Sequence, residues 1–377
     1  MEVLFLNGPV QNGAFDFQDK PGKAVGMRIA AALNGILDVG PAPHLWNTVT
    51  LEGDLRHRRS TVSPQVSRRE FETDLISSKY PPESRSATAV ATDTDAEVQQ
   101  LALEMIERRL RAGLLRISTE AVPTCQDCGH MTGHGADQCK ACGGLRIRLL
   151  TSRHLVAENP EGAPALGRAD IHASQRRQPL HLQSTSSNVP RLLILSRTRS
   201  YGIDLSSLGL PGFVLDPRVG LHVAVLAVAR RSEARKAVML TTENAANHVA
   251  AYGRLFREQD GTRLQYALHG HCPYDELPIA LRPIYATYHA GPAARTAFET
   301  WFLPLVTLKE KSAIQTGQLP ALFKHFIRTY VTNFTEADDE EVGALRSAVA
   351  AGDPAWVMNK RHLATALRLT RKPLARR

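Results

Sequence analysis

The sequence lacks an apolar run long enough to cross a bilayer, and it lacks the opening of a secreted protein. It has no stretch of about 18 uninterrupted apolar residues, which excludes the usual membrane-spanning helix. The first residues lead directly into the apolar residues 3–6, without the basic start of a signal peptide. We therefore expect a cytoplasmic protein with no membrane partner.

Cysteine is scarce and unevenly placed, which argues against a disulfide framework. Four of the five cysteines fall in one short window, as Cys125, Cys128, Cys139 and Cys142, and Cys272 stands apart. In a reducing compartment, two Cys-x-x-Cys pairs indicate a metal site. Four thiolates complete the tetrahedral shell of zinc and leave no open position, so we expect a structural zinc and not a catalytic one.

A glycine follows the second cysteine of each pair. Gly129 and Gly143 let backbone amides approach the sulfurs and disperse their charge, as a metal knuckle requires. Two alternatives remain open at this point. The cluster could be a redox or vestigial one without metal, or His130 or His134 could replace a cysteine as ligand.

Size, apolar content and charge set broader bounds. With 377 residues and 43% hydrophobic residues, the chain is too apolar to be wholly disordered and long enough for two domains or for one domain with a large insertion. The net charge of +9 is dominated by arginine clusters such as 56–59 and 230–231. Guanidinium groups suit a phosphate-bearing partner, although the same arginines could simply be solvated.

Apolar patterning predicts strands that alternate with helices, which is typical of an α/β fold with a parallel sheet. The expected strands cover residues 3–6, 191–195, 237–241 and 264–269. The expected helices cover residues 22–37, 94–113, 219–229, 244–256 and much of the chain beyond 296, including a basic amphipathic helix at 356–371. Thr94 to Glu97 form a capping box for the second helix. Residues 56–93 and 155–189 are polar and are expected to form loops.

The order of several short segments resembles methionyl-tRNA synthetases. The run from Thr92 through Gly144, which contains the double knuckle, is similar to the entry into the zinc-bearing connective insertion of that family. In the second half, residues 196–203 resemble the family's Ser-Arg…Trp-Gly-Ile segment, residues 241–248 its Gly-Lys-Asp-Asn-x-x-Phe-His segment, and 269–270 its His-Gly pair. The resemblance implies a class I synthetase fold: a split Rossmann-like (HUP-type) parallel sheet with a zinc-knuckle insertion and a C-terminal helical segment.

The resemblance also implies a division of the chain. Residues 1–120 and 190–295 would form the two halves of the nucleotide-binding α/β domain, and residues 121–189 would form the connective insertion between them. Residues 296–377 would form a helical segment, too short for a full anticodon-binding domain. Recognition of a tRNA anticodon is therefore not expected.

Both signatures of the family are altered. The His-x-Gly-His signature falls on Asp16 to Asp19, so that two carboxylates replace two imidazoles that steady ATP phosphates. The pair could hold Mg²⁺, an amine or a hydroxyl, or it could be a solvated turn in a site that has lost ATP chemistry. The Lys-Met-Ser-Lys-Ser signature is reduced to Lys309, Glu310, Lys311 and Ser312, where a lysine could contact a phosphate or lie in a solvated loop.

By the resemblance, the site residues can be assigned provisional roles. Asp16, Asp19 and Lys311 would be catalytic, and His248 would bind the amino-acid substrate. ATP, with Mg²⁺, would be held by Asn12, Gly13, Glu243, Asn244 and Lys309. The family's aromatic-Asp-Ala-Pro segment aligns with Asp216-Pro217-Arg218, so the pocket is altered and methionine specificity is not expected.

Two functions compete. The first is an ATP-dependent ligase that joins an amino acid to a small non-tRNA acceptor through an aminoacyl adenylate, including ester formation with an N-hydroxylated amino acid in a biosynthetic pathway. The second is a catalytically dead pseudo-synthetase that binds a nucleotide, a tRNA acceptor end or a partner protein. Genuine methionyl-tRNA charging is disfavoured by the altered signatures. A zinc-ribbon DNA-binding protein would explain the cysteines and the charge, but not the ordered segments on either side.

Overall fold

The computed structural model describes a core of strands and helices and a smaller C-terminal set of helices. The described residues are 1–8, 25–40, 42–46, 90–93, 95–133, 135–139, 142–159, 166–172, 182, 186–199, 202–270, 316–326, 328, 337–352, 361–362, 364–366 and 368–369. None of the described helices combines the length and apolarity that a bilayer crossing requires.

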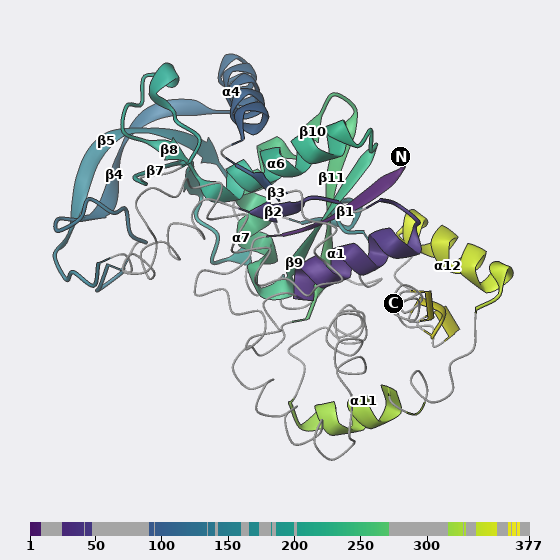
Figure 1. Ribbon diagram of the computed structural model, residues 1–377. Coiled ribbons are helices and arrows are strands. Elements are labelled where there is room, and N and C mark those ends of the chain that lie inside the picture. The colour runs from purple at the N-terminus through teal and green to yellow at the C-terminus, as the bar shows by residue number, and fades with distance from the viewer. Residues whose placement is uncertain are drawn as a thin grey trace, which may run out of the picture.

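A four-stranded sheet forms the centre of the molecule (Figure 1). Its strand order is β1 (Val3–Asn7), β9 (Lys236–Thr242), β11 (Thr262–His269) and β10 (Glu258–Gln259). The first three strands are parallel, and β10 joins antiparallel through the turn at Asp260-Gly261. In the register, Val3 lies opposite Lys236, so the first strand of the chain pairs with a strand from its second half. The predicted α/β class and its split parallel sheet are confirmed.

Helices cover both faces of this sheet, which explains why every residue of β1 is buried. Helix α1 (Val25–Ile36) packs on β1 and β9, and α6 (Pro217–Arg231) packs on β9 and β11. Helix α7 (Glu243–Gly253) connects β9 to the 3₁₀ turn η5 (Arg254–Phe256). These helices and strands match the ranges predicted from apolar patterning to within a few residues.

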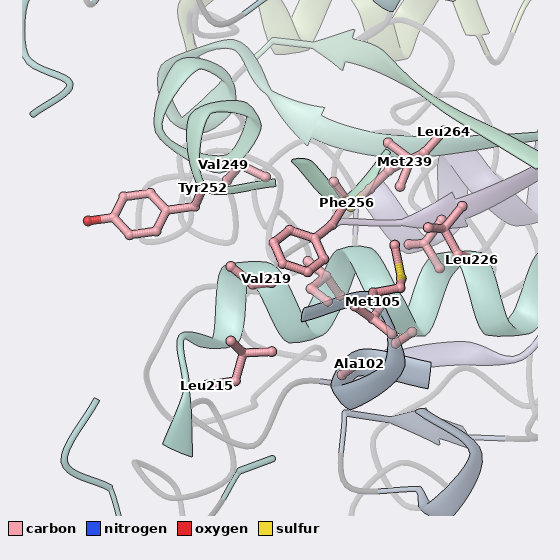
Figure 2. Close-up of a cluster of buried hydrophobic side chains, with 14 of the residues drawn as sticks. Ala102, Met105, Leu215, Val219, Leu226, Met239, Val249, Tyr252, Phe256 and Leu264 are labelled. Atoms are coloured by element: carbon pink, nitrogen blue, oxygen red, sulfur yellow. The ribbon is translucent and has the colours of Figure 1, made fainter. Parts of the chain in front are cut away.

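Helix α6 is buried on all sides, as its nearly continuous apolar sequence requires. Figure 2 shows Val219 and Leu226 of α6 against Met105 of α4 (Ala96–Arg111) and against Phe256 of η5. The same cluster includes Met239 of β9 and Leu264 of β11. Strand β4 follows α4 in the chain and leads to the first cysteine. Helix α4 therefore links the core to the cysteine-bearing segment.

Two asparagine side chains satisfy backbone groups in β1 and in the neighbouring strand β2. The Asn34 side chain accepts from the amide of Phe5 at 2.9 Å and donates to its carbonyl at 2.8 Å. The Asn7 side chain does the same for Leu45 in β2 (His44–Trp46), with both distances 2.8 Å. These bonds satisfy buried backbone groups that would otherwise be costly.

The insertion contains a strand that the sequence analysis missed. Strands β4 (Arg116–Cys125), β5 (Ile147–Glu158) and β6 (Leu192–Ile194) form an antiparallel sheet. Residues 155–158 were assigned to a polar loop and are instead the end of β5, where residues 154–157 are buried. Because Leu149 and Leu150 are both exposed, the strand lacks the alternation that would have predicted it.

Two further predictions need correction at element boundaries. Residues 90–92 were expected in a loop, yet β3 (Val90–Thr92) pairs in parallel with β2. Helix α4 begins one residue later than the capping box predicted, because Asp95 is its N-cap. The Asp95 carboxylate does not cap the helix and instead accepts from the amide and hydroxyl of Thr92. The predicted N-cap, Thr94, lies outside the described residues.

The remaining elements are short or C-terminal. The short ones are β7 (Ser196–Arg197), β8 (Val214–Leu215), η3 (Arg168–Asp170), η4 (Ser206–Leu208) and η7 (Thr316–Gln318). Beyond residue 296 the structure describes α11 (Leu319–Phe326) and α12 (Asp339–Ala351), in agreement with the predicted helical segment. Residues 361–362, 364–366 and 368–369, within the predicted basic helix, are also helical.

A neutral histidine holds α6 against β11. His222 contacts the carbonyl of Arg218 through Nδ1 and the hydroxyl of Tyr266 through Nε2 at 2.6 Å. Burial lowers the pKa of His222 to about 4 and raises the pKa of Tyr266 to about 12. Tyr266 therefore donates to Nε2, while Nδ1–H donates to the carbonyl.

We expect the free energy of unfolding to fall as the pH drops from about 6.5 to about 4. Burial lowers the pKa of His172 to about 4 and that of His44 to about 3, so the unfolded chain takes up protons that the folded chain refuses. The stabilisation is complete above pH 6.5 and is lost below it. Urea titrations at several pH values give the free energy of unfolding at each pH. Across that range, this free energy should fall less for His222→Gln than for the wild type, by on the order of 2 kcal/mol. The variant His325→Gln, at an exposed position, serves as control. The same fall in unfolding free energy in the wild type and in both variants would contradict the prediction.

Candidate functional site

The four cysteines of the predicted metal site converge at the tip of the β4–β5 ribbon. Their Sγ atoms all lie within 4.8 Å of one another. The Sγ atoms of Cys125 and Cys142 are 3.6 Å apart, and those of Cys128 and Cys139 are 3.7 Å apart. A tetrahedral zinc with bonds of about 2.3 Å places its sulfurs about 3.8 Å apart, so the donor set and its spacing fit zinc.

The two halves of the cluster have the same backbone geometry. The amide of Gly129 donates to the carbonyl of Cys125 at 2.9 Å, and the amide of Gly143 donates to the carbonyl of Cys139 at 2.8 Å. Both glycines have left-handed φ values, +70° and +77°, which a side chain would strain. The spacing and the glycines therefore form two equivalent knuckles, as the sequence predicted.

Groups around the cluster hold the two knuckles together. Asp127, in the first knuckle, forms an ion pair with Arg146, which follows the second. A Cβ atom at Gly144 would lie 2.2 Å from the Asp127 carboxylate and 3.2 Å from the Cys125 sulfur, so this position requires glycine. Desolvation and the neighbouring thiols raise the pKa of Cys128 to about 12. A bound cation would offset that effect by stabilising the thiolates.

The histidines considered as substitute ligands do not join the cluster in the described part of the chain. His130 contacts the guanidinium of Arg199, with its Nε2 at 2.9 Å. The described metal-ligating group consists of the four cysteines. His134 lies outside the described residues.

A second cluster lies at the N-terminus of α6, beside the last turns of α7. Asp216 is the N-cap of α6, and its carboxylate accepts from the amide of Arg218 at 2.9 Å. The Arg218 guanidinium binds the same carboxylate with two nitrogens, at 2.9 and 2.7 Å, and Arg197 binds it at 2.6 Å. Burial alone would raise the pKa of Asp216, but Arg218 and Arg197 outweigh burial and hold the pKa well below its usual range.

Tyr252 and His248 add a helix face to this cluster. They lie four residues apart on α7 and so share a face. The guanidinium of Arg218 stacks 3.3 Å from the centre of the Tyr252 ring, and Arg197 donates to its hydroxyl at 3.2 Å. Figure 2 shows the Tyr252 ring at the margin of the buried cluster, with its hydroxyl pointing outward. Burial, and then the charge of Arg218, lower the pKa of His248, so this imidazole is neutral at pH 7.

Two arginines and one carboxylate leave one positive charge in excess at this edge. The N-terminus of α6 lies there, and the positive end of its helix dipole adds to the excess. In open α/β sheets, the carboxyl ends of the strands are the usual binding edge. The cluster is thus suited to the carboxylate or phosphate of a ligand.

The structure describes only three of the predicted ATP, catalytic and substrate-binding residues, and the roles assigned to these three also stay predictions. Glu243 is buried as the first residue of α7, directly after β9, and Asn244 follows it. His248 is half-buried beside Arg218. Asn12, Gly13, Asp16, Asp19, Lys309 and Lys311 lie outside the described residues, so their assigned roles stay predictions.

Sequence reasoning missed Arg197, Arg218 and Tyr252 as site residues. The Asp216-Pro217 pair is a strong helix start, and it could have indicated that Arg218 lies in the first turn beside the capping carboxylate. The spacing of four residues between His248 and Tyr252 was a second signal. That Arg197 joins them depends on β7, which no local pattern predicted.

Comparison with known proteins identifies the fold. No protein-family model and no curated protein matches the chain. Among solved structures, methionyl-tRNA synthetase of Mycobacterium tuberculosis in complex with methionyl-adenylate is similar, with a TM-score of 0.53 and 12% identity, over 100% of this chain and 84% of that chain. A second structure of that enzyme bound by methionyl-adenylate has a TM-score of 0.55 and 12% identity, over 99% and 83% of the two chains.

The chain therefore has the fold of a class I aminoacyl-tRNA synthetase. Within that class its fold is like that of methionyl-tRNA synthetase, as the ordered segments of the sequence predicted. The division of the chain at residues 120, 189 and 295 stays a prediction.

We expect purified protein to contain one zinc per chain, bound by the four cysteines. Cys128→Ser should lose the metal and lower the free energy of unfolding, because the remaining thiols no longer complete a tetrahedral shell. Metal analysis by mass spectrometry and thermal unfolding check both effects, and Cys272→Ser is the matched control. Metal-free wild-type protein with four reactive thiols and unchanged stability would refute the assignment.

Proposed function

We propose that this protein is an ATP-dependent ligase that joins an amino acid to a non-tRNA acceptor through an aminoacyl adenylate. The observation that carries the proposal is the cluster of Arg197, Asp216, Arg218 and Tyr252 at the binding edge of a synthetase-like sheet. Its excess positive charge suits the carboxylate that is activated and the phosphate to which it is joined.

The proposed reaction has two steps. The amino-acid carboxylate oxygen attacks the α-phosphorus of ATP, and pyrophosphate leaves. A hydroxyl or amine of the acceptor then attacks the acyl carbon and AMP leaves, so that the acyl group is transferred with loss of the acceptor's proton. His248, whose pKa is lowered by burial and by the charge of Arg218, is the residue proposed to accept or orient that proton. An acceptor with an N-hydroxyl group would yield an ester.

Arg218 also supports a substrate other than methionine. A guanidinium beside a thioether would lose water without gaining a charged partner, which is unfavourable. The same guanidinium, fixed by Asp216 and stacked on Tyr252, would favour an acidic or strongly polar side chain. The zinc knuckles would have a structural role and take no part in the chemistry.

Pyrophosphate exchange across a panel of amino acids tests this pocket. We expect exchange with at least one polar or acidic amino acid and little with methionine. Arg218→Gln should raise KM for the preferred amino acid by roughly tenfold or more, since it removes a charge-assisted hydrogen bond. Arg218→Lys should restore part of the loss, and Arg231→Gln, in the last turn of the same helix, is the control. Preferred exchange with methionine would contradict the altered specificity.

The two aspartates at the position of the His-x-Gly-His signature give an independent test of catalysis. Asp16→Asn combined with Asp19→Asn should abolish exchange while leaving the thermal unfolding temperature unchanged, because the pair is proposed to bind Mg²⁺ or an amine. Circular dichroism verifies the fold. If the double variant keeps full activity, or wild-type protein shows no exchange but binds ATP, the pair is a relic and the pseudo-synthetase becomes the better account.

A further inference from the structure

A second charged hollow shares no lining residue with the cluster around Asp216. It has a volume of about 680 Å³ and lies between the C-terminal end of α4, the turn η5 and the β10–β11 hairpin. Figure 1 shows α4 and β10 on the same side of the molecule, with α6 between them. Strand β10 and the turn of this hairpin precede β11, so the hollow adjoins the amino end of β11.

Five arginines line this hollow, and they come from segments far apart in the sequence. They are Arg108, Arg109, Arg254, Arg257 and Arg263. Three carboxylates share the lining, which leaves an excess of two positive charges. An arginine-rich composition alone would distribute these charges over the surface, where solvent separates them. Here the fold gathers them around one concavity.

The carboxylates neutralise only one side of the hollow. Asp170 forms ion pairs with Arg257 at 3.2 Å and Arg263 at 3.6 Å. Asp260 lies 3.7 Å from Arg230, which is not part of the lining. On the α4 side, Arg108, Arg109 and Arg254 form no ion pair with any described residue.

The guanidinium of Arg109 is held in place by neutral groups. It donates to the carbonyls of Met105, at 2.9 Å, and Leu255, and it lies 5.0 Å from the centre of the Phe256 ring. Burial and the charge of Arg108 both lower the pKa of Arg109, which reflects an environment short of negative charge. A guanidinium that is already ordered loses little entropy when it binds an anion.

Apolar side chains lie beside these charges. Leu114, which is 55% exposed, and Leu255 line the same hollow. The volume lies within the range of small-molecule pockets, roughly 300–1,000 Å³. A ligand with both phosphate groups and an apolar body would satisfy the guanidinium groups and cover the two leucines.

We propose that this hollow binds a small organic phosphate of nucleotide size, which carries two or more negative charges. The arginine forks contact its phosphates, and Leu114 and Leu255 contact its organic part. None of Arg197, Asp216 and Arg218 lines the hollow, so the proposal does not depend on the proposed ligase activity.

Titration calorimetry with ADP tests the proposal on the full-length protein. We expect the double variant Arg108→Gln, Arg254→Gln to bind ADP roughly tenfold or more weakly at this site, because it removes two charge-assisted contacts. Neither arginine has an ion pair with described residues, so circular dichroism should be unchanged. Exposed Arg153→Gln is the matched control and should bind as wild type. Adenosine, which has no phosphate, should bind far more weakly than ADP.

A second variant tests the volume of the hollow separately from its charge. Leu114→Trp fills the hollow, keeps all five arginines and should also block ADP. ADP binding that is unaffected by both variants, adenosine binding as tight as ADP binding, or no ADP binding would overturn the proposal. Tighter binding of a single-stranded RNA oligonucleotide through the same arginines would overturn it in favour of a nucleic-acid surface. Arg218→Gln should leave ADP binding at the hollow intact, which keeps this result independent of the ligase test.

Discussion

The parallel pairing of β1 with β9 is the constraint on which the rest of the structure depends. It joins the first residues of the chain to its second half, so everything between them must leave the sheet and return to it. Parallel strands need long crossovers, and here the crossover is long enough to carry a separate antiparallel ribbon. Helix α6, buried on every side, fills the space between α4 and the sheet. The side chain of Asn34 then satisfies the backbone of Phe5 in β1, and the side chain of Asn7 joins β1 to Leu45 of β2.

The β4–β5 ribbon and the four-stranded sheet are stabilised in different ways. The sheet buries apolar side chains on both faces, whereas the tip of the ribbon exposes Leu149 and Leu150 and contains little core of its own. A small segment of this kind commonly relies on a metal. The sulfur spacing, the left-handed glycines and the Asp127 ion pair all favour one tetrahedral cation at that point.

Arginine has a different role at each edge of the sheet. At the N-terminus of α6, Asp216 fixes two guanidinium groups in one geometry, and Tyr252 covers that of Arg218, so a single positive charge remains for a ligand. At the amino edge, the arginines outnumber the carboxylates, and several have no charged partner among the described residues. Excess positive charge therefore gathers at two places of different shape, one charge at the cluster and two at the hollow.

Periodicity and short motifs were sufficient to predict β1, β9, β11, α6 and the four-cysteine cluster, because each depends on neighbours close in sequence. Burial of a continuous apolar run and the spacing of two Cys-x-x-Cys pairs are local properties. Strand β5 could not be predicted, since its pairing with β4 and not its own pattern stabilises it. The meeting of Arg197, Arg218 and Tyr252, and the gathering of five arginines around one hollow, were decided only by the tertiary structure. Coulomb energy and desolvation depend on distances in space, and those distances exist only after β9 has paired with β1 and β11.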